Sequence, residues 1–282
     1  MKYAVSSYSF SNLIKSGEMT QLDCIKKAKE MGFDAIEMVE IANFAQDDLM
    51  GYAKELAKEA QKQKIEISNL AVGADFINAF NGDTAKEIER VKTMVDAAEV
   101  MGSPCIRHDV IYSLEKCSSF DRALPIIADA CLEITQYAQE KGIKTSIENH
   151  GFICQDSNRI ERLFNSVNHP NFGVLVDIGN FTCVDENPVT AVSRVAPYAV
   201  YVHAKDFLIR NGEGKNPGRG FFKSRGGNYL RGTILGHGDV QVKQCLDILK
   251  NAGYDGYITL EYEGLEPTLL GIEIGFENLK NY

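Results

Sequence analysis

The strongest constraint on the fold is a regular alternation of short apolar runs with longer segments of helical periodicity. The apolar runs predict strands at residues 3–8, 35–39, 65–72, 105–108, 143–147, 172–176, 199–203 and 257–260. Helices are predicted at residues 20–31, 49–63, 84–101, 120–141, from about 157, 189–195, 240–252 and 269–280. Eight strand and helix pairs are typical of a closed (β/α)8 barrel, so we predict an α/β fold, a single-domain TIM barrel over residues 1–282.

The alternative is an open, doubly wound parallel sheet, which is built from the same alternation. Such sheets usually carry a glycine-rich phosphate-binding turn after an early strand, and the segment Tyr8-Ser9-Phe10-Ser11 does not match GxGxxG. A length of 282 residues fits either two ordinary domains or one barrel, but no Pro/Ser-rich linker divides the chain. These observations favour the single barrel.

One glycine-rich segment, residues 207–239, interrupts the alternation after the seventh predicted strand. A loop of this length in a compact domain is normally either functional or disordered. Its GEGKN sequence lacks the GK[ST] of a phosphate-binding loop, so it gives no support for nucleotide binding. Because the loops that follow barrel strands lie at the face that carries active sites, we expect this long loop to cover the site as a lid.

Four neighbouring predicted strands end on ionisable residues: Glu148, Asp177, His203 and Glu261. Any one of them alone is more often a solvated loop residue or a core histidine, but the C-terminal ends of barrel strands meet at one face. Three carboxylates brought together there would repel one another without a cation. Three oxygen ligands and one nitrogen suit Mn²⁺, with Zn²⁺, Co²⁺ or Mg²⁺ as alternatives. The sequence therefore predicts a metal site at the barrel mouth.

Residues close to these strand ends are candidates for substrate contacts, because residues two apart in a strand share a face. His150 shares the face of Glu148, and Lys205 shares the face of His203. Each could instead hydrogen-bond to a metal ligand. Asn149 faces the other way, toward the helix layer, so we expect it to serve packing and hydrogen bonding.

Two further strand ends are open to more than one interpretation. Arg107 and His108 end the fourth predicted strand, where they either contact substrate or form a local ion pair with Asp109. Glu37 ends the second predicted strand and points either to the barrel mouth or to solvent. His237 in the glycine-rich segment is more simply a solvated loop residue.

The charge and the cysteine content limit the expected binding partners and the expected cellular compartment. The 30 Lys and Arg residues against 39 Asp and Glu give a net charge of -9, which argues against binding a run of nucleic-acid phosphates. Seven cysteines without CxxC or other metal-binding spacing predict reduced, mostly buried thiols. With neither a signal peptide nor a long apolar run in the sequence, we expect a cytoplasmic protein that does not bind membranes.

Several motifs carry a resemblance to a known family: MGFDAIEMVE at 31–40, IENHG at 147–151, LVDIGN at 175–180, VHAKD at 202–206, GHGDV at 236–240 and GYDGYITLEYEG at 253–264. With these motifs, nearly the whole chain resembles the xylose isomerase-like superfamily. Within it, the chain is most similar to the sugar phosphate isomerase/epimerase group, which includes ketose 3-epimerases and inosose dehydratases.

The resemblance implies one divalent metal ion on Glu148, Asp177, His203 and Glu261. It also implies that the two glutamates act as acid and base on opposite faces of a sugar carbon beside a carbonyl, through a metal-stabilised enediolate. We expect substrate contacts from six residues: His150, Lys205, His108, Glu37, Arg210 and Tyr8. Arg210 is included because ketose 3-epimerases usually place a substrate-binding arginine shortly after the histidine ligand.

Departures from related DNA-repair endonucleases further exclude nucleic acid as a partner. Those enzymes resemble this family but assemble three zinc ions with a histidine three residues after the aspartate and an Asp-x-His pair on the later loop. Here the corresponding positions hold Asn180 and the triplet His237-Gly238-Asp239.

The leading hypothesis is a metal-dependent epimerase or isomerase of a small sugar or sugar derivative. One alternative is a metal-dependent lyase or dehydratase that acts on an inosose or on a 3-keto sugar or glycoside, because the ligand set suits loss of a β-hydroxyl equally well. A second alternative is a non-catalytic sugar-binding barrel. Barrels of this group commonly pair, so a homo-oligomer is possible.

Overall fold

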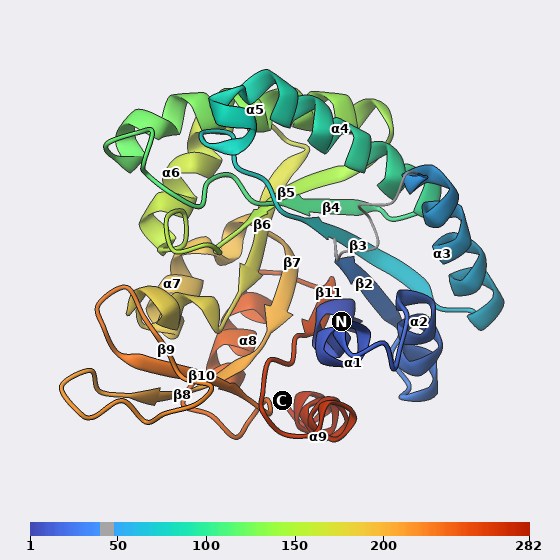
Figure 1. Ribbon diagram of the computed structural model, residues 1–282, viewed down its shortest axis with the longest axis vertical. Coiled ribbons are helices and arrows are strands. Elements are labelled where there is room, and N and C mark those ends of the chain that lie inside the picture. The colour runs from blue at the N-terminus through green and yellow to red at the C-terminus, as the bar shows by residue number, and fades with distance from the viewer. Residues whose placement is uncertain (40–47) are drawn as a thin grey trace.

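The fold is a closed barrel of parallel strands in a computed structural model that describes residues 1–39 and 48–282 (Figure 1). Its strands are β1 (Lys2–Ser6), β2 (Ala35–Val39), β3 (Glu66–Val72), β4 (Cys105–His108), β5 (Lys144–Glu148), β6 (Phe172–Asp177), β7 (Ala199–Ala204) and β11 (Tyr257–Leu260). Each strand pairs with its neighbour in the chain, and β11 closes the barrel between β7 and β1. The predicted TIM barrel is confirmed.

Helices surround the barrel as an outer layer (Figure 1). They are α1 (Ser11–Lys15), α2 (Gln21–Glu30), α3 (Leu49–Gln63), α4 (Thr84–Met101), α5 (Phe120–Glu140), α6 (Ser157–Val167), α7 (Pro188–Val195), α8 (Val242–Asn251) and α9 (Thr268–Lys280). Thr20 and Asp23 form a reciprocal capping box at the start of α2. Gly102, with φ +73°, ends α4 in the left-handed conformation that glycine adopts without strain. The residues 40–47 lie outside the described part, so the last residue of the MGFDAIEMVE motif has no structural account.

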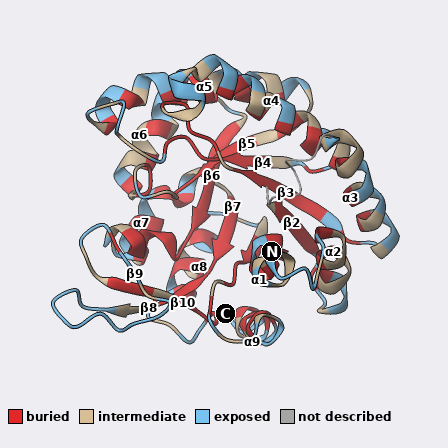
Figure 2. Ribbon diagram, viewed as in Figure 1, coloured by how far each residue is buried: buried red, intermediate tan, exposed pale blue. Residues whose placement is uncertain are grey.

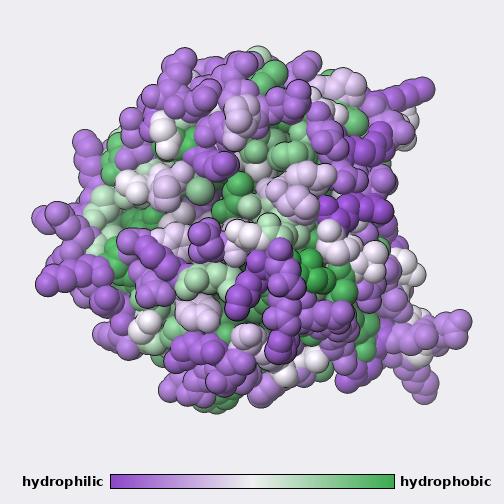
Figure 3. Space-filling model, turned by 180° about the vertical axis from the view of Figure 1, so that it is seen from behind, coloured by the Kyte–Doolittle hydropathy of each residue, from purple (hydrophilic) through white to green (hydrophobic). Residues whose placement is uncertain are grey.

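The strands form the buried centre of the molecule, and the helices expose only their outer faces (Figure 2). Inside the barrel, the fully buried Tyr201 fills the space below the strand ends. Its hydroxyl lies 2.6 Å from Ser68 Oγ and accepts a hydrogen bond from Thr259 Oγ1 at 2.7 Å. The outer surface seen from behind is mostly hydrophilic, with hydrophobic side chains in small groups (Figure 3). No helix among the described residues is long and apolar enough to cross a bilayer.

The glycine-rich segment differs from the predicted loop. It contains a three-stranded antiparallel sheet in the order β8 (Asp206–Arg210), β10 (Tyr229–Thr233), β9 (Phe222–Lys223). This sheet lies next to α7 at the edge of the molecule (Figure 1). Short strands separated by glycines give little alternation of apolar and polar residues, which is why the sequence predicted only a loop.

Both ends of this segment meet at the carboxylate of Asp206. That carboxylate accepts hydrogen bonds from the backbone N–H groups of Phe207, Gly236, Gly238 and Val240, at 2.9, 2.9, 2.8 and 3.1 Å. A Cβ atom on Gly238 would lie only 2.1 Å from Asp206 Oδ1, so this close turn requires glycine. The VHAKD and GHGDV motifs therefore form one structural unit.

Candidate metal centre and active site

Four polar side chains converge at the C-terminal end of the barrel. Glu148 ends β5, Asp177 ends β6 and lies beside His203 of β7 in the strand register, and Glu261 directly follows β11. One ligand atom from each of the four lies within 4.8 Å of the other three. His203 Nδ1 is 3.7 Å from a Glu148 oxygen, 3.8 Å from an Asp177 oxygen and 3.6 Å from a Glu261 oxygen.

The donor atoms of this cluster fit a divalent cation. Asp177 Oδ2, His203 Nδ1 and Glu261 Oε2 are buried and make no hydrogen bond. Buried polar atoms are normally satisfied, and although Lys205 contacts the two carboxylate oxygens, His203 Nδ1 has only carboxylates around it and lacks a hydrogen-bond partner. Three carboxylates and an imidazole are ligands of Mn²⁺, Zn²⁺ and similar ions. The four predicted metal ligands could therefore hold one ion between them.

His203 is oriented for this role by a carboxylate behind it. Its Nε2 lies 2.9 Å from Glu37 Oε2, which also accepts a hydrogen bond from Asn69 Nδ2 at 2.8 Å. Glu37 is fully buried. Burial opposes protonation of His203, but Glu37 and the neighbouring carboxylates outweigh it and raise the pKa of the imidazole well above its usual value. The contact with Glu37 leaves Nδ1 directed into the cluster.

Glu148 is held in its ionised form by two neighbours. Arg107 Nε donates to Glu148 Oε2 at 2.6 Å, and Arg107 Nη2 contacts the same oxygen. Asn180 Nδ2 donates to the other oxygen, Oε1, at 2.9 Å. Burial favours the neutral acid, but Arg107, followed by His203, lowers the pKa of Glu148 well below its usual range.

Asp177 is fixed mainly by backbone groups. Its Oδ1 accepts the N–H groups of Gly179 and Asn180 at 2.8 and 2.9 Å. The side chain of Asn149 bonds the backbone of Asp177 twice, donating to its carbonyl at 2.8 Å and accepting from its N–H at 2.9 Å. Asn149 thus serves hydrogen bonding, as predicted. Burial raises the pKa of Asp177 to about 7, against the opposing effect of Lys205.

Lys205 is the cation next to this cluster. Its Nζ lies 3.0 Å from Asp177 Oδ2 and 2.9 Å from Glu263 Oε1, and it also contacts Glu261 Oε2. The ammonium thus offsets part of the negative charge at Asp177 Oδ2 and Glu261 Oε2, although neither of these two contacts has the geometry of a hydrogen bond. Burial disfavours the ammonium, but Asp177, Glu261 and Glu263 raise the pKa of Lys205 well above its usual value.

His150 enters the cavity beside a second carboxylate. Its Nδ1 lies 2.9 Å from Asp109 Oδ1, while Arg107 Nη1 and the Tyr112 hydroxyl donate to Asp109 Oδ2 at 3.1 and 2.5 Å. Burial opposes protonation of His150, but Asp109 reverses this effect and raises the pKa of the imidazole. Arg107 therefore bonds both Glu148 and Asp109, the carboxylate that holds His150.

These groups line a cavity of about 310 Å³, a small size for a ligand pocket. Its lining consists of Tyr8, Val39, Ala71, Gly73, Arg107, Asp109, Tyr112, Glu148, His150, His203, Lys205, Glu261 and Glu263. Of the predicted substrate contacts, Tyr8, His150 and Lys205 belong to this lining. No residue of the glycine-rich segment 207–239 belongs to it, so the structure shows no lid closed over the cavity.

Three predicted substrate contacts do not line the cavity. His108 is fully buried on the opposite face of β4, where its Nδ1 bonds the carbonyl of Asp109 at 2.9 Å. The register pairs Arg107 with Ser146, two residues before Glu148, so Arg107 and not His108 shares the face of Glu148. Glu37 lies behind His203. Arg210 is half exposed on β8, 3.5 Å from Asp239, because pairing with β10 directs this strand away from the mouth.

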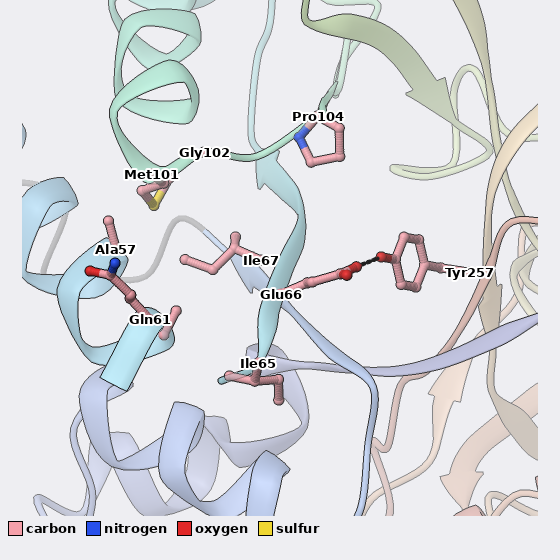
Figure 4. A pocket seen from close by; sticks show the side chains of 10 residues that line it. Ala57, Gln61, Ile65, Glu66, Ile67, Met101, Gly102, Pro104 and Tyr257 are labelled. Carbon is pink, nitrogen blue, oxygen red and sulfur yellow. Dashed lines mark hydrogen bonds between the residues drawn. The ribbon is translucent and has the colours of Figure 1, made fainter. Parts of the chain in front are cut away.

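A second cavity, of about 400 Å³, lies at the opposite end of the barrel, near the starts of β3 and β11 (Figure 4). Its ionisable lining residues, Glu66 and Tyr257, hydrogen-bond to each other, and the rest of the lining is mostly apolar. In TIM barrels this end contributes to stability and the C-terminal end carries the chemistry. The smaller cavity at the mouth is therefore the candidate active site.

Sequence reasoning assigned no role in this site to Tyr112 and Asn180. It offered Asp109 as an ion-pair partner of Arg107 and His108, and Arg107 pairs with Asp109 at 3.1 Å. Strand periodicity places Glu263 on the face of Glu261, but which residue of the fourth strand shares the face of Glu148 depends on the strand register. Tyr112 lies in a loop without periodicity, and no sequence pattern marks its contact with Asp109.

The comparisons with known proteins agree with this architecture. An inosose dehydratase of Clostridium botulinum is 24% identical over 256 residues, which cover 83% of each chain. The crystal structure of the IOLI protein with a bound zinc atom has a TM-score of 0.77 at 17% identity, covering 100% of this chain and 97% of the other. A D-tagatose 3-epimerase-like protein has a TM-score of 0.71 at 22% identity, covering 100% and 98%.

Structural similarity at these identities shows the fold alone. The sequence profile described as "Xylose isomerase-like TIM barrel", however, matches residues 25–282. The chain belongs to the xylose isomerase-like TIM barrel family.

Proposed function

We propose that this protein is a divalent-metal-dependent epimerase or isomerase that removes the proton next to the carbonyl of a small sugar or sugar derivative. The observation that carries the proposal is the convergence of four ligand atoms within 4.8 Å, three of them buried without a hydrogen bond. A bound divalent ion would act as a Lewis acid that stabilises negative charge developing on the substrate oxygens.

Glu148 and Glu261 are the proposed proton-transfer pair. Glu261 Oε2 makes no hydrogen bond and faces the cavity beside the ammonium of Lys205, which suits a proton acceptor. Glu148 approaches from β5 with one oxygen held by Arg107 and the other by Asn180. His150 and Lys205 line the same cavity and would orient substrate hydroxyl groups.

A lyase or dehydratase is the second candidate, and a specific contact favours it. The two nitrogens of Arg107 on Glu148 Oε2 disfavour protonation of that carboxylate, so Glu148 is the weaker partner for returning a proton to the opposite face. A single proton acceptor would suffice for abstraction followed by loss of a β-hydroxyl. The similarity to an inosose dehydratase over 83% of the chain supports the same candidate.

Proton NMR in D₂O distinguishes these reactions. Protein loaded with Mn²⁺ is incubated with ketoses, inososes and 3-keto glycosides. Deuterium incorporation with a retained formula indicates an epimerase or isomerase, whereas loss of water or of an aglycone indicates a lyase. No reaction with any compound, at full metal occupancy, would instead favour the alternative of a sugar-binding barrel without catalysis.

Amide variants test the proton-transfer pair. Glu261→Gln and Glu148→Gln should each abolish exchange, because an amide accepts no proton at neutral pH. Glu266→Gln, outside the cavity lining, is the matched control and should keep wild-type exchange. Unchanged exchange in both Glu261→Gln and Glu148→Gln would disprove the assignment.

A further inference from the structure

The basic side chains that line the cavity at the barrel mouth already meet carboxylates. Arg107 directs Nε at Glu148 and Nη1 at Asp109, at 2.6 and 3.1 Å. The carbonyl of Val72 accepts a further hydrogen bond from Arg107 Nη1 at 3.2 Å. His150 Nδ1 lies 2.9 Å from the same Asp109. Arg107 and His150 are therefore engaged within the protein, and neither is a dedicated partner for an anionic group of a substrate.

Lys205 is surrounded by three carboxylates. Its Nζ lies 3.0 Å from Asp177 Oδ2 and 2.9 Å from Glu263 Oε1, and it also contacts Glu261 Oε2. The side chain of Lys205 is only 5% exposed, whereas that of Glu263 is 27% exposed. Glu263 lines the cavity and is not one of the four candidate metal ligands. A molecule that enters the cavity therefore meets the carboxylate of Glu263 more readily than the ammonium behind it.

Carboxylates outnumber cations at this cavity. Arg107 and Lys205 are the two permanent cations of the described lining. Six carboxylates lie in the lining or directly behind it: Glu37, Asp109, Glu148, Asp177, Glu261 and Glu263. A bound divalent ion would require ionised carboxylates and a neutral His203, and would still leave two negative charges in excess, or one if His150 is protonated. Residues 40–47, outside the described part, contain neither Lys, Arg nor His, so they add no positive charge. This excess of negative charge repels anions.

We propose that the cavity selects an uncharged polyhydroxy carbonyl compound, without a phosphate or carboxylate group, and that Glu263 is a specificity-determining residue for this selection. Glu263 Oε1 accepts a hydrogen bond from Lys205 at 2.9 Å, and a carboxylate can accept several more, so Glu263 can receive substrate hydroxyl groups. The same carboxylate repels an anionic substituent and keeps Lys205 from pairing with it. This inference rests on the proposed function for the carbonyl chemistry. It adds the charge of the substrate, which neither the fold nor the ligand set defines.

Two pairs of ketoses test this selection. Protein loaded with Mn²⁺ and freed of excess ion is titrated calorimetrically with D-fructose and D-fructuronate, and with D-tagatose and D-tagaturonate. Within each pair, the second compound carries a carboxylate in place of the C6 hydroxymethyl group. In the pair that binds more tightly, the Kd of the anionic compound should be about 100-fold higher, which is the repulsion between like charges about 6 Å apart at an effective dielectric constant of about 20. Added salt should reduce this ratio, because it screens the repulsion.

The variant Glu263→Gln keeps the shape of the side chain but removes one negative charge, so it should lower the ratio to about tenfold. The side chain is partly exposed, so this variant should remain folded. Glu266→Gln is the matched control, because Glu266 does not line the cavity, and it should keep the wild-type ratio. A wild-type ratio below about threefold, the same ratio in Glu263→Gln as in the wild type, or binding of none of the four compounds would overturn the selection.

Proton exchange in D₂O separates this inference from the proposed function. Deuterium incorporation into both members of a pair at equal rates would leave the proposed function standing and overturn the selection. Absence of exchange with a preserved binding ratio would do the reverse, because the charge selection would remain while the proposed reaction failed.

Discussion

Replacing Glu37 by Gln should weaken metal binding without removing a ligand. Glu37 is fully buried, and its Oε2 lies 2.9 Å from His203 Nε2. The amide keeps the shape but removes the negative charge that orients and polarises the imidazole. The other ligands keep their supports, since Glu148 is held by Arg107 and Asn180. Loss of such a partner typically lowers metal affinity about 10- to 100-fold, which corresponds to roughly 1.4–2.7 kcal/mol.

Two measurements check this expectation. Titration of apo-protein with Mn²⁺ gives Kd directly. In thermal unfolding, a fixed saturating Mn²⁺ concentration should stabilise the variant less than the wild type by the same free energy. The increase in Tm that Mn²⁺ causes should then be smaller by about 3–10 °C. Glu87→Gln is the control, because Glu87 is also buried but bonds Arg90 and the backbone of Asp75 instead. An unchanged Kd in Glu37→Gln, or an equal loss in Glu87→Gln, would refute the reasoning.

Three further predictions concern stability. Burial lowers the pKa of His108 to about 4, despite the hydrogen bond to the Asp109 carbonyl, so the unfolded chain takes up this proton first as the pH falls. Between about pH 6.5 and 4 the wild type should therefore lose roughly 3 kcal/mol of unfolding free energy, which the His108→Gln variant should keep. Urea unfolding at several pH values would reveal the difference. Arg107→Gln leaves buried carboxylates unpaired and should cost about 3–5 kcal/mol in urea unfolding, and a loss below 1 kcal/mol would contradict the ion-pair assignment. Asp206→Asn should cost roughly 3 kcal/mol by thermal unfolding, because an amide cannot accept all four backbone N–H groups, whereas the exposed Asp239→Asn should change stability far less.

Sequence periodicity predicted the barrel well because strands and helices of this fold have strong local signals. The predicted strands at 35–39, 105–108 and 257–260 coincide with β2, β4 and β11. Their apolar runs are buried on both faces, and glycines end several helices, so the boundaries are marked in the sequence itself. The sheet of β8, β9 and β10 carries no such signal. Its strands are short, and their pairing depends on contacts between residues that are distant in the sequence.

The sequence could predict only those site residues that follow from the positions of strand ends and from the alternation of side chains along a strand. The convergence of Glu148, Asp177, His203 and Glu261 follows from the closure of the barrel. The choice between Arg107 and His108 depended on the register of β4 against β5, which one sequence does not reveal. The loop contact of Tyr112 has no periodic signal at all. Which oxygen pairs with which cation likewise depends on three-dimensional packing.

The hydrogen bonds to the Asp206 carboxylate affect which part of this chain could change in sequence and length. The chain leaves the barrel at β8 and returns at Gly236–Val240, and one carboxylate binds both ends. Residues between them form a closed excursion, so their number can change at a small entropic cost without displacing β7 or β11. Ser224, Gly226 and Asn228 bond Asp185, so this part of the segment is tied to the barrel. Grafting other sequences into the tip, between Asn211 and Phe221, would be a direct way to add new surfaces while leaving the candidate metal site unaltered.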